Sequence, residues 1–290
     1  MTGLLVPMLV ATLVLVSAQR AEAGKAATVT PPTQPARLFS PLDSRTIELL
    51  RHGLERRALE LAGIFAGAVG MLALGLVDDK RELGPATKFA GQFLIALLVA
   101  ASGARITLFV HSSVFHYVIT ILWILSVINA FNFMDNMNGL CAGLGAIGAW
   151  YFALIAAADG QYLVALIAFL TCGALFGFLP FNFPRARAFL GDAGSHLVGY
   201  LLAILAILPH FYTPRQQRRW AVLIPLLVLA VPLLDMARVV LLRWRLGRPF
   251  YIGDTNHLSH RLVTLGLSRT TAVLLIWLIA AAIGAVVYLC

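Results

Sequence analysis

The chain has 290 residues, of which 60% are hydrophobic and 12% are charged, and its mean hydropathy is +0.87. A soluble domain is about half apolar and about a quarter charged, so this composition excludes a soluble globular protein and indicates a polytopic membrane protein. The net charge of +9 indicates basic loops that face lipid headgroups or an anionic substrate. The sequence contains no recognisable nucleic-acid-binding motif, so we expect no nucleic-acid partner.

A membrane-spanning helix needs about 20 mostly apolar residues, and nine segments of the chain qualify, two of them marginally. The nine segments are 3–18, 60–77, 89–104, 115–129, 140–158, 161–180, 196–211, 220–241 and 270–289. We therefore expect an all-α integral membrane protein, a bundle of about nine transmembrane helices that forms one catalytic domain over residues 1–290. A signal peptide is an alternative interpretation of the first segment, although that segment has no basic n-region.

If consecutive spans alternate across the bilayer, four connections share one face: 78–88, 130–139, 181–195 and 242–269. Each of them carries a dense polar motif, whereas the connections at the other face, including residues 19–58, carry none. Lys and Arg are divided equally between the two faces, so the positive-inside rule assigns no orientation. The alternation itself predicts one composite active site.

The first motif, Gly75-Leu-Val-Asp78-Asp79-Lys80, ends the second span. Adjacent carboxylates repel each other unless they share a cation or a proton. Mg²⁺ suits them because it takes oxygen ligands and keeps sites for waters and phosphates, but a solvated helix end explains the pair alone equally well. Lys88 begins the next span at the same face, where it could contact a phosphate or anchor the helix at the interface.

The second motif, Asn129–Leu140, follows an uncharged run and contains Asn132, Asp135 and Asn138. Such a cluster at a membrane helix end is costly unless it meets water, a cation or a polar ligand. A polar turn is the alternative, because Asn-Gly is a strong turn signal. The density of asparagine beyond that turn favours a ligand site.

The third motif places Asp192 between Gly191 and Gly194, just before a span. This pattern predicts a tight turn that brings a carboxylate and backbone N–H groups to a helix N-terminus, where anions bind. A helix N-cap is the alternative role for Asp192.

In the fourth motif His257 and His260 are three residues apart, and Arg261 follows. These residues fit phosphate recognition or acid–base chemistry. A zinc site is disfavoured because no third ligand is suitably spaced. A basic loop that binds lipid headgroups is the alternative. Upstream, Asp235 and Arg238 have the i,i+3 spacing of a structural ion pair.

Together the four motifs resemble those of the polyprenyl-phosphate N-acetylhexosamine-1-phosphate transferases, of glycosyltransferase family 4 type, over about residues 60–289. These membrane enzymes transfer a sugar-1-phosphate from a UDP-sugar to a polyprenyl phosphate and release UMP. The matching stretches are Leu74-Gly-Leu-Val-Asp78-Asp79, Asn129-Ala-Phe-Asn132-Phe-Met-Asp135, Phe189-Leu-Gly191-Asp192-Ala-Gly-Ser195 and His257-Leu-Ser-His260-Arg261-Leu. As a set they are specific, although each alone is not.

The resemblance implies a Mg²⁺ site, with Mn²⁺ as an alternative, whose ligands are Asp192, Asn132 and Asp79. Asp78 and Asp79 match an acidic pair, of which one is proposed to activate the lipid phosphate. Asp135 is assigned to the catalytic group without a defined role. The resemblance also implies substrate-binding positions, with phosphate contacted by Lys88, uracil by Asn138 and Phe189, and the pyrophosphate by His257, His260 and Arg261.

The implied partners are a UDP-N-acetylhexosamine, a polyprenyl phosphate and the bilayer, and a homodimer is left open. The implied location is the inner (plasma) membrane with a cytoplasmic active site, where the reaction begins cell-envelope polysaccharide synthesis. The family also has an additional N-terminal span and a basic loop before it, so we expect that the chain is truncated or its start mis-assigned.

The chain departs from the family pattern at two motifs. Bacterial members usually have Asp-Gly-x-Asp-Gly where this chain has Asp135-Asn-Met-Asn138-Gly, and the UDP-GlcNAc group often has His-x-His-His-Arg where this chain has Ser259 as its third residue. The transferases for UDP-MurNAc-pentapeptide have three consecutive histidines there. The sequence therefore favours UDP-GlcNAc as donor, with UDP-MurNAc-pentapeptide as the alternative.

Three other functions compete with this interpretation. A transporter would not predict four motifs on one face and would need broken helices, for which the sequence gives no strong signal. The acidic signature of CDP-alcohol phosphotransferases is absent from the sequence. A degenerate relative that binds lipid without turnover is the remaining alternative.

Overall fold

The structure is a computed structural model that describes residues 58–107, 110, 112–209, 219–247, 249 and 256–289. The predicted span at 3–18 lies outside these residues, as does almost all of the segment 19–58.

The described residues form helices and contain no strand. Six of the helices are long and apolar enough to cross a membrane. The number of candidate spans is seven if one pair of helices that meet at a bend is counted as a single span. The helices are α3 (Ala58–Arg81), α4 (Pro85–Ser102), α5 (Ser113–Met134), α6 (Leu140–Ala158), α7 (Tyr162–Asn182), α8 (Gly191–Leu205), the 3₁₀ helix η1 (Arg219–Leu223), α9 (Ile224–Val228), α10 (Ala230–Arg245), α11 (Leu258–Thr264) and α12 (Arg269–Leu289). The protein is therefore an all-helical, multi-pass membrane protein, and its described residues account for six or seven of the nine expected spans.

The predicted span 220–241 is broken rather than continuous. Residues Ala221–Val228 and Ala230–Arg245 meet at an angle of 70°. Pro232 has no N–H to donate to the carbonyl of Val228, and its ring would clash with that carbonyl in a straight helix. No strong signal for a broken helix was recognised in the sequence, but Pro232 was such a signal.

The predicted span 196–211 is also displaced. Helix α8 begins at Gly191, which has a left-handed φ of 63°, and it ends at Leu205 after 15 residues. This is shorter than the practical minimum of roughly 17 residues for a span. The early start brings Asp192 into the first helical turn.

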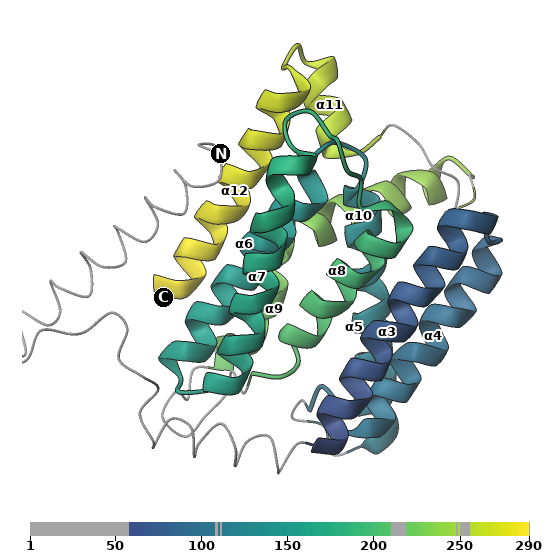
Figure 1. Ribbon diagram of the computed structural model, residues 1–290, viewed down its shortest axis with the longest axis vertical. Coiled ribbons are helices and arrows are strands. Elements are labelled where there is room, and N and C mark those ends of the chain that lie inside the picture. Colours follow the sequence, from purple (N-terminus) through teal and green to yellow (C-terminus); the bar gives the residue numbers. More distant parts are fainter. Residues whose placement is uncertain are drawn as a thin grey trace, which may run out of the picture.

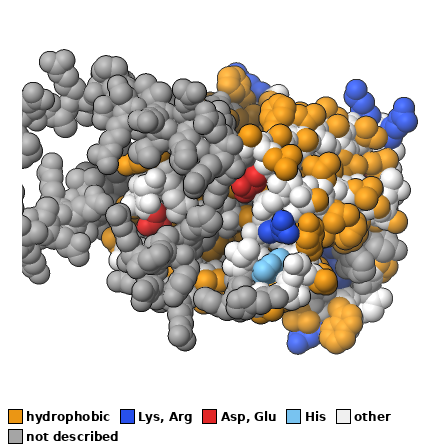
Figure 2. Space-filling model, turned by 90° about the horizontal axis from the view of Figure 1, so that it is seen from below, with side chains coloured by type: hydrophobic (Ala, Val, Ile, Leu, Met, Phe, Trp, Pro, Cys, Tyr) orange, Lys and Arg blue, Asp and Glu red, His pale blue; other side chains and the backbone are white. Residues whose placement is uncertain are grey.

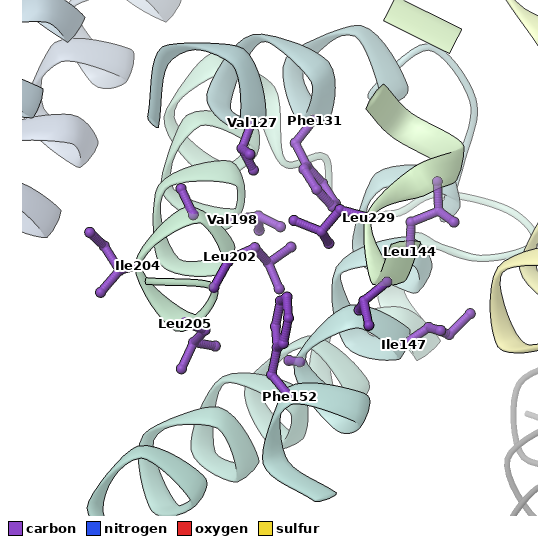
Figure 3. Packing of buried hydrophobic residues seen from close by; sticks show 14 of the residues in the cluster. Val127, Phe131, Leu144, Ile147, Phe152, Val198, Leu202, Ile204, Leu205 and Leu229 are labelled. Atoms are coloured by element: carbon purple, nitrogen blue, oxygen red, sulfur yellow. The ribbon is translucent and has the colours of Figure 1, made fainter. Parts of the chain in front are cut away.

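Helix α8 occupies the middle of the bundle, where it packs against α3 and α5 (Figure 1). Helix α6 packs against α7 and α12, and α4 packs against α3 and α5. In the core, Phe131 of α5 and Leu202 of α8 converge on Leu229 at the helix break, with Phe152 of α6 beside them (Figure 3). Close van der Waals packing of this kind holds membrane helices together, because lipid is as apolar as the core.

The outer helix faces are apolar as well as the core. Phe65 and Leu76 of α3, Leu94 of α4 and Leu122 of α5 are all exposed in the isolated chain. Viewed from the end away from α11, hydrophobic side chains cover much of the described surface and charged ones are scattered (Figure 2). These faces are suited to lipid.

Candidate active site

The four predicted motifs meet at one end of the bundle. Hydrogen bonds and ion pairs that involve side chains connect loops that are far apart in the sequence, and each motif takes part. The connecting pairs are Asp79–Asp192, Lys88–Asp192, Asn132–Asp192, Asn138–Pro184, Gly139–Asn182 and Asn136–Ser259. The alternation of spans therefore predicted the correct grouping.

Asp79 joins the end of α3 to the start of α8. Its Oδ1 accepts a hydrogen bond from the N–H of Asp192 (2.7 Å), and its Oδ2 accepts one from the N–H of Ala193 (3.1 Å). These N–H groups lack partners within their own helix, and a carboxylate also complements the positive end of the helix dipole. Asp79 thus caps α8 from a neighbouring helix and sets the position of Asp192.

Lys88 bridges two carboxylates. Its Nζ lies 2.8 Å from Asp78 Oδ2 and 2.9 Å from Asp192 Oδ1. Asp78 is buried, and its Oδ1 also accepts a hydrogen bond from the N–H of Leu83 (2.8 Å). Because a buried charge is costly unless it is paired, the ammonium of Lys88 is the group that compensates the two acids.

Asn132 completes the surroundings of Asp192. Its Nδ2 donates to Asp192 Oδ1 (2.5 Å) and to Ser195 Oγ (3.0 Å). The carboxylate of Asp192 is therefore held by α4 and α5 while it lies at the N-terminus of α8. Asp192 is the point at which three of the four motifs meet.

The residues around Asp192 fit a magnesium ion. Asp78 and Asp192 already direct carboxylate oxygens at one shared cation, the ammonium of Lys88. Mg²⁺ needs one or two carboxylates and retains several waters or substrate phosphates. In the described part of the chain no three His, Cys, Asp or Glu side chains form a ready-made metal site, so the remaining ligands would come from water and phosphate. The metal roles of Asp192, Asn132 and Asp79 stay predictions.

Asp135 lies at the end of α5, beside this cluster. Burial raises the pKa of Asp135 to about 7; the negative charges of Asp192 and Asp79 add to the increase, and a hydrogen bond from the backbone of Gly191 opposes it. A carboxyl group with a pKa near neutrality can both accept and release a proton at physiological pH. This property is compatible with the predicted catalytic role, which stays a prediction.

Asn138 and Phe189 lie on neighbouring loops. Asn138 is exposed, and its Nδ2 donates to the carbonyl of Pro184 (3.2 Å), which belongs to the loop that leads to Phe189. The side chain of Phe189 is 76% exposed, so its ring is accessible for stacking on a planar ligand. Their predicted contacts with uracil stay predictions.

His257 is held by Asp235, for which the sequence suggested a different partner. Asp235 Oδ2 lies 2.7 Å from His257 Nδ1, and Asp235 Oδ1 accepts a hydrogen bond from the N–H of Leu258 (2.6 Å). Arg238, the predicted partner of Asp235, donates instead to the carbonyl of Asn256 (3.3 Å). The acid therefore orients the imidazole and caps the start of α11, which is a role that i,i+3 spacing could not reveal.

Aromatic contacts place the same histidine against α5. The ring of Phe133 meets His257 edge-on with centroids 5.5 Å apart, and Arg243 Cζ lies 5.2 Å from the centroid of Phe133. On α11, His260 is half-buried and Arg261 is exposed. The basic residues predicted to bind pyrophosphate thus share one short helix and its N-cap.

Gln92 is a residue of the site that the sequence motifs did not include. It is buried one helical turn along α4 from Lys88, where its Oε1 accepts a hydrogen bond from Asn129 Nδ2 (2.8 Å) and its Nε2 lies 3.3 Å from His196 Nε2. The signal was its i,i+4 spacing from Lys88, which places both side chains on one face of α4.

An apolar groove of about 540 Å³ runs between α4 and α5. Phe89 and Phe93 line it from α4, and Tyr117, Ile121 and Leu125 line it from α5. Phe89 directly follows Lys88 in α4, although Lys88, Asp78 and Asp192 do not themselves line the groove. An apolar groove on the surface of a membrane protein suits a lipid chain.

Comparison with known proteins gives matches over much of the chain. Residues 61–210 match the sequence model of glycosyl transferase family 4. The chain is 32% identical over 227 residues to a probable undecaprenyl-phosphate N-acetylglucosaminyl 1-phosphate transferase of Bacillus subtilis, in an alignment that covers 76% of this chain and 63% of the relative. It is 36% identical over 245 residues to a decaprenyl-phosphate N-acetylglucosaminephosphotransferase of Mycobacterium leprae, with coverage of 75% and 61%.

A third relative has a different donor in its name. The phospho-N-acetylmuramoyl-pentapeptide-transferase of Lacticaseibacillus paracasei is 36% identical over 160 residues, or 51% of this chain and 48% of the relative. The chain spans less than two thirds of the length of each of these three relatives.

Proposed function

Because the chain belongs to glycosyl transferase family 4, we propose that it transfers N-acetylglucosamine-1-phosphate from UDP-GlcNAc to a polyprenyl phosphate and releases UMP. The observation that carries the proposal is the cluster of Asp78, Lys88 and Asp192, together with an apolar groove whose lining includes Phe89, the residue after Lys88. A site for soluble phosphate substrates would not need such a groove. Two relatives that cover about three quarters of the chain are named for transfer of this sugar phosphate.

The groove between α4 and α5 receives the prenyl chain of the acceptor. Its lining is apolar and includes Phe89, which follows Lys88 in α4. The ammonium of Lys88 then turns from the carboxylates to the lipid phosphate, which lowers the repulsion between two anionic substrates.

The donor binds at the second, third and fourth motifs. Asn138 and Phe189 contact the uracil, and His257, with His260 and Arg261, contacts the pyrophosphate. The contact between His257 and Asp235 (2.7 Å) supports this role, because it fixes the orientation of the imidazole.

In the reaction, an oxygen of the lipid phosphate attacks the β-phosphorus of the donor, and the bond from that phosphorus to the UMP oxygen breaks. Asp135, whose pKa is raised to about 7, can hold the proton of the acceptor phosphate, and the hydrogen bonds of Asp79 to the start of α8 keep Asp192 in place. When bound, Mg²⁺ supplies positive charge that stabilises the phosphates as charge develops. Asp78 and Asp192 are the residues that would hold it, with Mn²⁺ as the alternative ion.

The site lies on the cytoplasmic face of the inner membrane in this proposal, where UDP-sugars are available. UDP-MurNAc-pentapeptide is the second donor to be tested, because one relative is named for transfer of phospho-N-acetylmuramoyl-pentapeptide. The histidine motif of this chain lacks three consecutive histidines, which favours UDP-GlcNAc, although Ser259 stands where the UDP-GlcNAc group often has a histidine.

The test is UMP release by purified protein supplied with UDP-GlcNAc, C55 polyprenyl phosphate and Mg²⁺, with and without EDTA. We expect EDTA-sensitive release, and Asp192→Asn should abolish it. Asp159→Asn, the same change in the α6–α7 turn, is the matched control and should retain activity. Absence of metal-dependent UMP release with either donor would refute the proposed function, and full activity of Asp192→Asn would refute the site.

A further inference from the structure

One hydrogen bond joins the loop after α5 to helix α11. Ser259 Oγ donates to Asn136 Oδ1 (2.7 Å), and Asn136 Nδ2 donates to the carbonyl of Phe133 (2.6 Å). Ser259 is only 1% exposed. Both the oxygen and the nitrogen of the Asn136 amide are therefore engaged, and this fixes the orientation in which Oδ1 accepts the hydrogen bond from Ser259.

This bond closes a ring of contacts around His257. The ring of Phe133 packs on His257, whose Nδ1 is held by Asp235, while the carbonyl of Phe133 is bound to Asn136. Ser259 lies two residues after His257. The first residue of helix α11, Leu258, is thus bound to α10, and its second residue, Ser259, is bound to the loop after α5.

We propose that Asn136 and Ser259 are a positioning pair that sets the distance between the two halves of the donor site. Asn136 lies two residues before Asn138, and Ser259 directly precedes His260. This role rests on the proposed function, because those halves are the predicted contacts of uracil and of pyrophosphate. Both positions also differ from the family patterns, in which they hold glycine and histidine.

The test is a double-mutant cycle of Ser259→Ala, Asn136→Ala and the double variant. A neutral hydrogen bond contributes about 1 kcal/mol, which is about fivefold in an equilibrium constant. We expect Ser259→Ala to raise the KM for UDP-GlcNAc about fivefold, with kcat and the KM for the lipid phosphate nearly unchanged. Asn136→Ala should raise it at least as much, because it also removes the bond to the carbonyl of Phe133. The double variant should be no worse than Asn136→Ala alone, because that single variant has already lost the bond between the two side chains.

Ser259→Thr keeps the hydroxyl and should retain a KM near that of the unchanged protein. Calorimetric binding of UDP gives a readout besides activity and should weaken in parallel. Independent effects that multiply in the double variant would overturn the pairing, and lower thermal stability with an unchanged KM would overturn the positioning role. Failure of the unchanged protein to release UMP refutes the proposed function instead, so the two failures are distinct.

Discussion

Gly75→Ala tests whether the contact between α3 and α8 sets the active site. A Cβ at Gly75 would lie 2.4 Å from Ala193 Cα, 2.6 Å from Ala193 N and 2.7 Å from Asp192 O. All three are backbone atoms, so no side-chain rotation can relieve the clash. The two helices must separate at the turn that carries Asp192.

The size of the effect follows from these distances. An ordinary contact begins at 3.4 Å, so the closest pair must move apart by about 1 Å. Asp79 lies one turn further along α3, and its bonds of 2.7 and 3.1 Å to α8 would then weaken or break. Overpacking costs about 1–3 kcal/mol, offset by up to about 1 kcal/mol of helix propensity. A displacement of about 1 Å can lower a rate about 100-fold.

The assays are the rate of UMP release and the unfolding temperature in detergent. Gly173→Ala is the matched control, because Gly173 is exposed on α7 and a Cβ there would meet nothing within 4 Å. We expect the control to keep its rate and stability, and Gly75→Ala to lose most of its rate. A Gly75→Ala protein with an unchanged rate would refute the reasoning.

Three further predictions concern single charged residues. Lys88→Met should lower the unfolding temperature in EDTA, because two carboxylates lose their counter-ion. Addition of Mg²⁺ should then raise the unfolding temperature more in this variant than in the unchanged protein. Equal rises in the two proteins would contradict a shared cation site. Asp235→Asn should raise the KM for UDP-GlcNAc about tenfold or more, because hydrogen bonds to charged groups contribute about 1.5–3 kcal/mol. An equal rise in the KM for lipid phosphate would contradict a role confined to the donor. Asp135 has a pKa raised to about 7, so the folded state retains its proton longer and stability falls as pH rises from about 4 to 7. In EDTA, Asp135→Asn should therefore stabilise the protein more at pH 8 than at pH 5, and an equal gain at both would contradict the raised pKa.

Local patterns in the sequence predicted much of the fold and the grouping of the site. Hydropathy located the helices that pass the length test, because a run of about 20 apolar residues is a property of the segment alone. Strict alternation then placed Asp79, Asn132, Asp192 and His257 at one end. The motifs were informative because polar residues at membrane helix ends are costly without a function.

The sequence by itself therefore determined the class of protein, the grouping of the four motifs on one face and the residue types available there. Only the tertiary structure decided the partners: Asp79 caps α8, Asp235 holds His257 rather than Arg238, and Ser259 meets Asn136. These contacts join residues 22 to 123 positions apart. No local pattern encodes them, because they depend on how the helices pack against one another in three dimensions.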